Sequence, residues 1–189
     1  MGLICDYPCR LDLWAEVVKA KNCQRQEEVL DEVLCIPDED VGGKISSIDD
    51  VRVQLVSAEE TFLNNLKVKV TIDFNVILIV VVGEAPGTFE LVTLEGFTFS
   101  KSINLDEFEP PLSPQEFKEE VERSQIVLKN WSFDVDILGN CEDPASPCFL
   151  PTPVEGTCIS LKVFVDIIDK LTKFHDIVVY AELDPETDC

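Results

Sequence analysis

The sequence lacks the residues and motifs on which most enzyme active sites depend. It has a single histidine, His175, which stands beside an aspartate near an expected turn. No G-x-S-x-G, P-loop or G-x-G-x-x-G motif occurs. Cysteine–histidine catalysis would need a cysteine close to His175 in the fold, and no spacing in the chain indicates one. We therefore expect a protein that is not an enzyme and holds no cofactor.

Basic residues are also scarce. The chain has 15 Lys and Arg against 37 Asp and Glu, which gives a formal net charge of -22. Such a surface repels nucleic acid and anionic membranes, so we expect neither as a partner. The same charge opposes self-association unless specific contacts, covalent bonds or cations offset it. No C-x-x-C pair or EF-hand loop is present, so no metal site is predicted.

Long hydrophobic runs and targeting signals are missing as well. No apolar stretch approaches the roughly 18 residues of a membrane-spanning helix. The start, MGLICDYPCRLDLW, has no basic segment followed by an apolar one, so it does not resemble a signal peptide. Yet the chain has eight cysteines, which favours an oxidised end-state. We expect a protein made in the cytosol and oxidised later, outside the cell.

What the sequence does have is β-strand periodicity. Apolar residues alternate with polar ones over 66–76, 125–138 and 158–167. Shorter strands are predicted at 89–93 and 96–103, with a turn at 169–173. A capping box at Ser113–Glu116 predicts one short helix ending near residue 123. These elements predict an all-β fold of about eight strands, an antiparallel β-sandwich resembling a jelly roll.

Composition divides the chain into three parts. Residues 1–43 are predicted to form an N-terminal cysteine-containing arm, 44–183 the β-sandwich domain, and 184–189 a tail that ends in cysteine. Within the arm, residues 11–17 alternate like a strand, and a helix over 15–30 is the competing interpretation. A loop at 37–43 would serve as a hinge between the arm and the sandwich.

One predicted strand is apolar on both of its faces. The run 77–82 contains only Ile, Leu and Val, so a partner surface must cover the side that does not face the core. The N-terminal arm, a local loop or a neighbouring subunit could supply that cover. We take Ile77, Ile79 and Val81 as the candidate assembly face.

The region Cys35–Phe108 resembles a SPOCS-type domain, found in spore coat and spore morphogenesis proteins. The similar segments are CIPDEDVGGKISSIDDVRVQLVSAEET, NNLKVKVTIDFNVILIVVVG and GFTFSKSINLDEF, although the family often has Glu-Gly where Thr71-Ile72 stands here. The resemblance implies synthesis in the mother cell without a signal peptide and exposure at the spore surface after lysis. It also implies a non-enzymatic role whose partners are copies of the chain itself and other coat proteins.

The cysteines form two groups with different expected roles. The candidates for interchain disulfides are Cys5, Cys9, Cys23, Cys35 and Cys189, near the two ends of the chain. The candidates for a disulfide within one loop are Cys141, Cys148 and Cys158. Reduced thiols and purely intrachain pairing are the alternatives. Cysteines at both ends resemble the arrangement in endospore appendage fibre subunits, whose N-terminal arms bond covalently to neighbours.

Together these observations predict a structural subunit that self-assembles into a spore-surface fibre or coat layer. Interchain disulfides and contacts between the arm and a neighbour would stabilise it. The alternative is a monomeric spore-coat adaptor or morphogenesis module that binds another coat protein.

Overall fold

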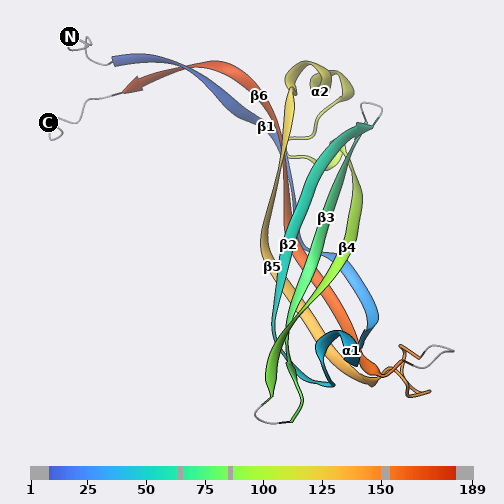
Figure 1. The fold of residues 1–189 in the computed structure, drawn as a ribbon. Coiled ribbons are helices and arrows are strands. Elements are labelled where there is room, and N and C mark those ends of the chain that lie inside the picture. Colours follow the sequence, from blue (N-terminus) through green and yellow to red (C-terminus); the bar gives the residue numbers. More distant parts are fainter. Residues whose placement is uncertain (1–8, 64–65, 85–86, 150–153, 182–189) are drawn as a thin grey trace, which may run out of the picture.

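The structure, a computed structural model, describes residues 9–63, 66–84, 87–149 and 154–181. These residues form six long strands, two short α-helices and a 3-10 turn (Figure 1). In chain order the elements are β1 (Cys9–Pro37), α1 (Asp38–Val41), β2 (Ile45–Leu63), β3 (Lys67–Val82), β4 (Thr88–Asn104), η1 (Leu105–Glu107), α2 (Pro114–Glu120), β5 (Arg123–Asn140) and β6 (Gly156–Ala181). The all-β prediction is confirmed, whereas the jelly-roll detail stays a prediction.

The strands form two antiparallel sheets of three strands each, in the orders β1-β6-β5 and β2-β3-β4. Each sheet has a central strand, β6 or β3, whose alternate side chains are buried. Valines, isoleucines and leucines from both central strands contribute to one hydrophobic core, together with Phe74. The sheets therefore pack against each other like the two layers of a sandwich.

The predicted N-terminal arm is not separate from the sandwich. Its residues 9–37 form edge strand β1, which pairs with β6 from Cys9 opposite Ala181 to Pro37 opposite Gly156. Ala20, Val29 and Ile36 of this strand are buried in the common core. The boundary at residue 43 therefore does not separate two bodies, because apolar side chains of β1 fill the core beside β6. The strand interpretation of residues 11–17 is confirmed over the helical one.

Two of the strands are longer than the sequence predicts. The expected strands at 89–93 and 96–103 are one strand, β4, in which a bulge at Gly96 (φ 84°) interrupts the pairing opposite Asn75. The Asn75 Oδ1 atom accepts a hydrogen bond from Gly96 N–H at this bulge. The expected turn at 169–173 is likewise absent, since β6 runs unbroken through it. The prediction took Gly96 as the start of a new strand and Asp169 as the start of a turn, and both interpretations were wrong.

The predicted capping box is confirmed at the start of α2. The Ser113 hydroxyl accepts the N–H of Glu116, whose carboxylate accepts the N–H of Ser113. The Ser113 hydroxyl also donates to the Glu116 carboxylate, and this bond, with the one from the Ser113 N–H, holds the pKa of that carboxyl below its usual value. The ring of buried Phe117 packs edge-on against Phe62 of β2, with centroids 5.0 Å apart. The helix thus closes one end of the sandwich. In the described part of the chain, no helix meets the length and hydropathy of a membrane span.

Candidate interaction site

Strands β1 and β6 continue beyond the sandwich as a two-stranded ribbon. Strand β5 begins at Arg123, opposite Thr172, so the part of β6 after Thr172 pairs with β1 alone. Figure 1 shows this ribbon leaving the body of the molecule beside α2 and extending away from both sheets. Among the residues whose side chains are described, the ribbon comprises 13–18 and 173–178.

The two faces of the ribbon differ in their side chains. On one face the aromatic rings of Trp14 and Phe174 stack with centroids 5.9 Å apart, and the Arg123 guanidinium lies 5.0 Å from the Phe174 centroid. Trp14 is nevertheless 68% exposed, and Val178 on the same face is 42% exposed. This face therefore presents a large aromatic surface to solvent.

The other face continues the inward-facing side of β6. Residues 173, 175 and 177 keep the alternation that buries Leu171, and they pair with 17, 15 and 13. We call this surface the inner ribbon face; it comprises Leu13, Ala15, Val17, His175 and Ile177. No described strand of sheet β2-β3-β4 pairs with it. Leu13 is 46% exposed, whereas Ala15, Val17, His175 and Ile177 are half-buried. These positions continue the core side of β6 with less apolar side chains, and the Nε2 atom of His175 is buried there without a hydrogen-bond partner.

Ion pairs attach the base of the ribbon to α2. The Lys19 Nζ lies 3.0 Å from a Glu120 carboxylate oxygen, and the Lys173 Nζ donates to the Glu119 carbonyl at 2.6 Å. The hydrogen bond from Lys19 is the main reason why the pKa of Glu120 lies below its usual value. These bonds fix where the ribbon leaves the sandwich while leaving its far part free.

A second uncovered apolar surface lies on the outer side of sheet β2-β3-β4. Here Ile79 is beside Leu91 and Val81 is beside Phe89, and Leu91 and Phe89 are 69% and 65% exposed. We call Ile77, Ile79, Val81, Phe89 and Leu91 the β3–β4 patch. Ile77, Ile79 and Val81 of the predicted assembly face are half-buried, and the N-terminal arm, one of the three covers considered for it, lies in the other sheet as β1.

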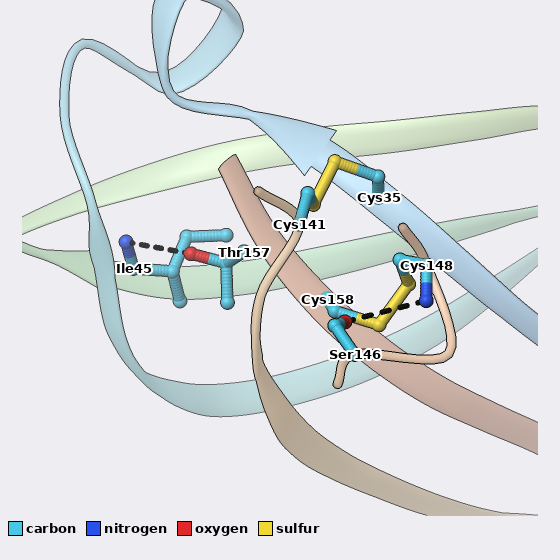
Figure 2. Close-up of a disulfide and its surroundings, with 7 residues drawn as sticks. All are labelled: Cys35, Ile45, Cys141, Ser146, Cys148, Thr157 and Cys158. Carbon is cyan, nitrogen blue, oxygen red and sulfur yellow. Dashed lines mark hydrogen bonds between the residues drawn. A yellow bond between two sulfur atoms is a disulfide. The ribbon is translucent and has the colours of Figure 1, made fainter. Parts of the chain in front are cut away.

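A pair of disulfides joins the chain at the end of the sandwich opposite α2 (Figure 2). Cys35 of β1 bonds Cys141, and Cys148 bonds Cys158 of β6, with Cα–Cα distances of 5.9 and 5.8 Å. Cys158 is fully buried. A hydrogen bond from Cys148 N–H to the Ser146 hydroxyl holds the turn that brings Cys148 inward.

The cluster is packed closely around Gly156. A Cβ atom at this position would lie 2.6 Å from the Ile36 carbonyl oxygen and 3.0 Å from the Cys35 sulfur. Only glycine allows β6 to begin so near to β1 and to the disulfide. Nearby, the Thr157 hydroxyl accepts a hydrogen bond from Ile45 N–H at 3.3 Å, which links the start of β2 to β6 (Figure 2).

This pairing corrects the expected role of Cys35. Its predicted place was among the interchain candidates, but β1 runs along β6 and so brings it within bonding distance of Cys141. Cys141, a candidate for a disulfide within its own loop, therefore bonds to β1 instead. Cys23 is exposed and is the free cysteine among the residues whose side chains are described, 13–178 with their gaps. Cys9 begins β1 at the ribbon tip. Cys5 and Cys189 lie outside the described residues.

Sequence reasoning missed a buried pair of carboxyl groups between the sheets. Glu60 of β2 and Asp169 of β6 lie together, with their four carboxyl oxygens buried. Burial is the largest cause that raises their pKa values, to about 8 for Glu60 and about 6 for Asp169. The charge of Asp169 raises the pKa of Glu60 further, so one proton is retained at neutral pH.

The signal for this pair was in the alternation of β6. Asp169 follows Val163, Val165 and Ile167 at intervals of two, which places it on the inward face. On either side of it in the sheet are Asn22 and Ile126. No group of three His, Cys, Asp or Glu side chains in the described ranges is arranged to hold a metal ion.

The arrangement defines an all-β protein with internal disulfides and exposed apolar surfaces. Residues 88–184, slightly more than half of the chain, match the model of a protein family described as a domain of unknown function, DUF8305. The chain belongs to this family. The match includes β4, α2, β5 and β6 and thus strands from both sheets. No curated protein and no solved structure matches the chain significantly.

Proposed function

We propose that this protein is a non-enzymatic structural subunit that assembles with copies of itself into a fibre or layer outside the cell. The observation that carries the proposal is the projecting ribbon, which has only two strands and exposes apolar side chains on both faces, Leu13 on one and Trp14 and Val178 on the other. An isolated two-stranded ribbon is only marginally stable in water. A neighbouring subunit would supply the surface that it lacks.

The disulfides support a location outside the reducing cytosol. Two bonds within one chain form and persist in oxidising surroundings. A stapled sandwich suits a subunit that must survive after the cell that made it is gone. The sequence resemblance to SPOCS-type domains is the basis for naming the spore surface as the place of assembly, and other coat proteins as further partners.

Interchain disulfides would make such an assembly permanent. The candidates are Cys5, Cys9, Cys23 and Cys189, of which Cys23 is exposed on β1. A bond between subunits slows their dissociation even where the noncovalent contact is weak. We therefore expect the assembly to combine noncovalent docking with covalent links.

Electron microscopy of the recombinant full-length chain tests this proposal, together with electrophoresis with and without reductant. We expect fibres or layers after oxidation, and ladders that collapse to the 21.2 kDa monomer on reduction. Substituting Cys5, Cys9, Cys23 and Cys189 one at a time by serine would show which residue forms the ladder. A monodisperse monomer at every concentration under oxidising conditions contradicts the proposal. If that monomer captured one defined coat protein, the adaptor alternative would replace it.

A further inference from the structure

The inner ribbon face includes no carboxyl side chain, and the Glu120 carboxylate of α2, at the base of the ribbon, is paired there with Lys19 and Lys173. Leu13 pairs with Ile177, Ala15 with His175 and Val17 with Lys173, whose amine is bonded to α2. The chain as a whole carries 37 acidic residues. A surface without any of them is one of the few places where a second copy could approach without strong repulsion.

The β3–β4 patch is also locally neutral. In the three rows of the sheet that hold Ile77, Ile79 and Val81, the β2 neighbours are Arg52, Asp50 and Ser47. Arg52 Nε lies 2.8 Å from a carboxylate oxygen of Asp50, so these two charges offset each other. The hydrogen bond from Arg52 is the main reason that the pKa of Asp50 is lowered, so the pair stays ionised.

The ribbon and the patch cannot meet within one molecule. The ribbon leaves the sandwich at the end where α2 lies, whereas the patch lies toward the other end of β3, near Val82 (Figure 1). Both surfaces are largely apolar sheet faces whose few charges are paired, and sheets bury such faces by packing against each other. A second copy is therefore the partner that satisfies both surfaces at once.

We propose that the inner ribbon face of one copy packs on the β3–β4 patch of a second copy. This inference rests on the proposed self-assembly and names the surfaces that make the junction. The contact joins two different surfaces, so each subunit can donate its ribbon to one neighbour and receive a ribbon from another. Repetition of this contact produces a ring or an open filament, depending on the rotation between successive copies.

The size of the contact sets its strength. A two-stranded ribbon about ten residues long has a footprint on the order of 300 Å², from the rise per residue and the spacing between strands. A stable interface commonly buries about 800 Å² on each partner. One junction alone therefore gives weak, concentration-dependent association, and a durable assembly also needs covalent links or many junctions.

The test uses two charge substitutions in the full-length chain, Leu13→Lys on the ribbon and Leu91→Lys on the patch. Both side chains are largely exposed, so the sandwich should tolerate either change. Sedimentation velocity without reductant, up to about 1 mM protein, measures association in this weak range. Each substitution should lower the association constant by about tenfold or more, because it places an unpaired ammonium in an apolar contact.

Mixing the two variants gives the decisive result. L13K retains an intact patch and L91K retains an intact ribbon, so an equimolar mixture should form one-to-one dimers and stop there. Matched controls are Val178→Lys, on the opposite ribbon face, and Ser102→Lys, on exposed β4 away from the patch. Both controls should assemble like the unmodified chain.

The outcomes separate this inference from the proposed function. If the unmodified chain assembles and L13K and L91K assemble equally well, the named contact is wrong and self-assembly stands. If only one of the two substitutions has an effect, or the mixture fails to dimerise, the pairing of these surfaces is overturned. If the unmodified chain never associates, the proposed function fails and this inference fails with it.

Discussion

The sandwich body and the projecting ribbon contain parts of the same two strands in two different environments. In the body, β6 lies between β1 and β5 under a second sheet, and Leu161, Val163 and Val165 are fully buried. In the ribbon, the same strand has one neighbour, and Ile177 at an equivalent position is only half-buried. The inward positions of β6 are mostly apolar in the body but include Lys173 and His175 in the ribbon, so both the composition of the strand and the layer above it differ between the two parts.

Because of this difference, we expect the body to provide most of the stability and the ribbon to provide a surface for interaction. The body has the buried side chains and both disulfides of the described structure, so its opening requires most of the free energy of unfolding. The ribbon depends on backbone pairing, the Trp14–Phe174 stack and ion pairs at its base. We expect it to open locally before the body unfolds, and the following predictions test that separation.

The largest effect should come from removing the disulfide between Cys35 and Cys141. It closes a loop with a sequence separation of 106 residues, whereas the bond from Cys148 to Cys158 has a separation of 10. Loop-closure entropy assigns about 4.8 kcal/mol to the first and about 2.7 kcal/mol to the second. The double variant C35A/C141A should therefore lose more stability than C148A/C158A, as measured by urea unfolding.

The reporter for that experiment distinguishes the two regions. Trp131 packs near Phe74 in the core, and Trp14 lies in the ribbon. In a Trp14→Phe background, fluorescence therefore follows the body alone. Cys23→Ala, which breaks no described disulfide, is the control. Equal losses from the two double variants would contradict the role assigned to the longer loop.

A smaller effect is expected from truncating one core side chain. Leu161→Ala should lower the free energy of unfolding by roughly 2–5 kcal/mol, because Leu161 is fully buried and its loss leaves a cavity. The matched ribbon variant, Ile177→Ala, should cost less than about 1 kcal/mol, since its position is only half-buried. Calorimetry on both variants measures the difference. Similar costs at the two positions would show that the ribbon is covered in solution.

The buried carboxyl pair predicts a pH dependence that belongs to the body. Folding raises the pKa of Glu60 from 4.5 to about 8 and that of Asp169 from 3.8 to about 6. The folded state thus binds protons more tightly than the unfolded state, so stability is highest below about pH 4 with respect to this pair and falls as the pH rises through 6 to 8. In its own sheet, Asp169 lies beside Asn22 of β1. In the other sheet, Glu60 pairs with Val70, and Lys101 is the residue on the far side of Val70.

Glu60→Gln tests that pH dependence. Lys101 is bonded to Glu27 at 2.7 Å, so it does not neutralise the pair. The variant should be more stable than the original protein near pH 8 by on the order of 2 kcal/mol, a value reduced to allow for partial solvent access. Thermal unfolding between pH 4 and 9 measures this, with exposed Glu59→Gln as the control. An unchanged pH profile would exclude a buried shared proton.

The smallest predicted effect concerns the aromatic stack of the ribbon. Trp14→Ala removes the contact with Phe174 and should destabilise the ribbon by about 0.5–1.5 kcal/mol. Amide hydrogen exchange should become faster over residues 13–18 and 173–178 while the exchange of the central β6 amides stays the same. Equally increased exchange in both regions would show that ribbon and body open together.

Much of the fold could be predicted from particular residues. The alternation in β3 and β6 correctly predicted their inward faces, and Ser113 with Glu116 correctly placed the start of α2. A glycine and a carboxyl residue inside strands were misleading. Gly96 marks a bulge rather than the start of a separate strand, and Asp169 faces inward rather than forming a turn. Local propensity cannot reveal that a carboxyl group has a partner on the opposite sheet.

By itself, the sequence determined the all-β class, the acidic surface and the abundance of cysteine, because strand periodicity and charge are local properties of the chain. Only the tertiary structure decided that β1 joins β6, that Cys35 bonds Cys141 and that Glu60 meets Asp169. It also decided that the end of this β1–β6 pair lies beyond the second sheet. These outcomes depend on which distant segments pair and how far each strand extends, and no local pattern of residues encodes either.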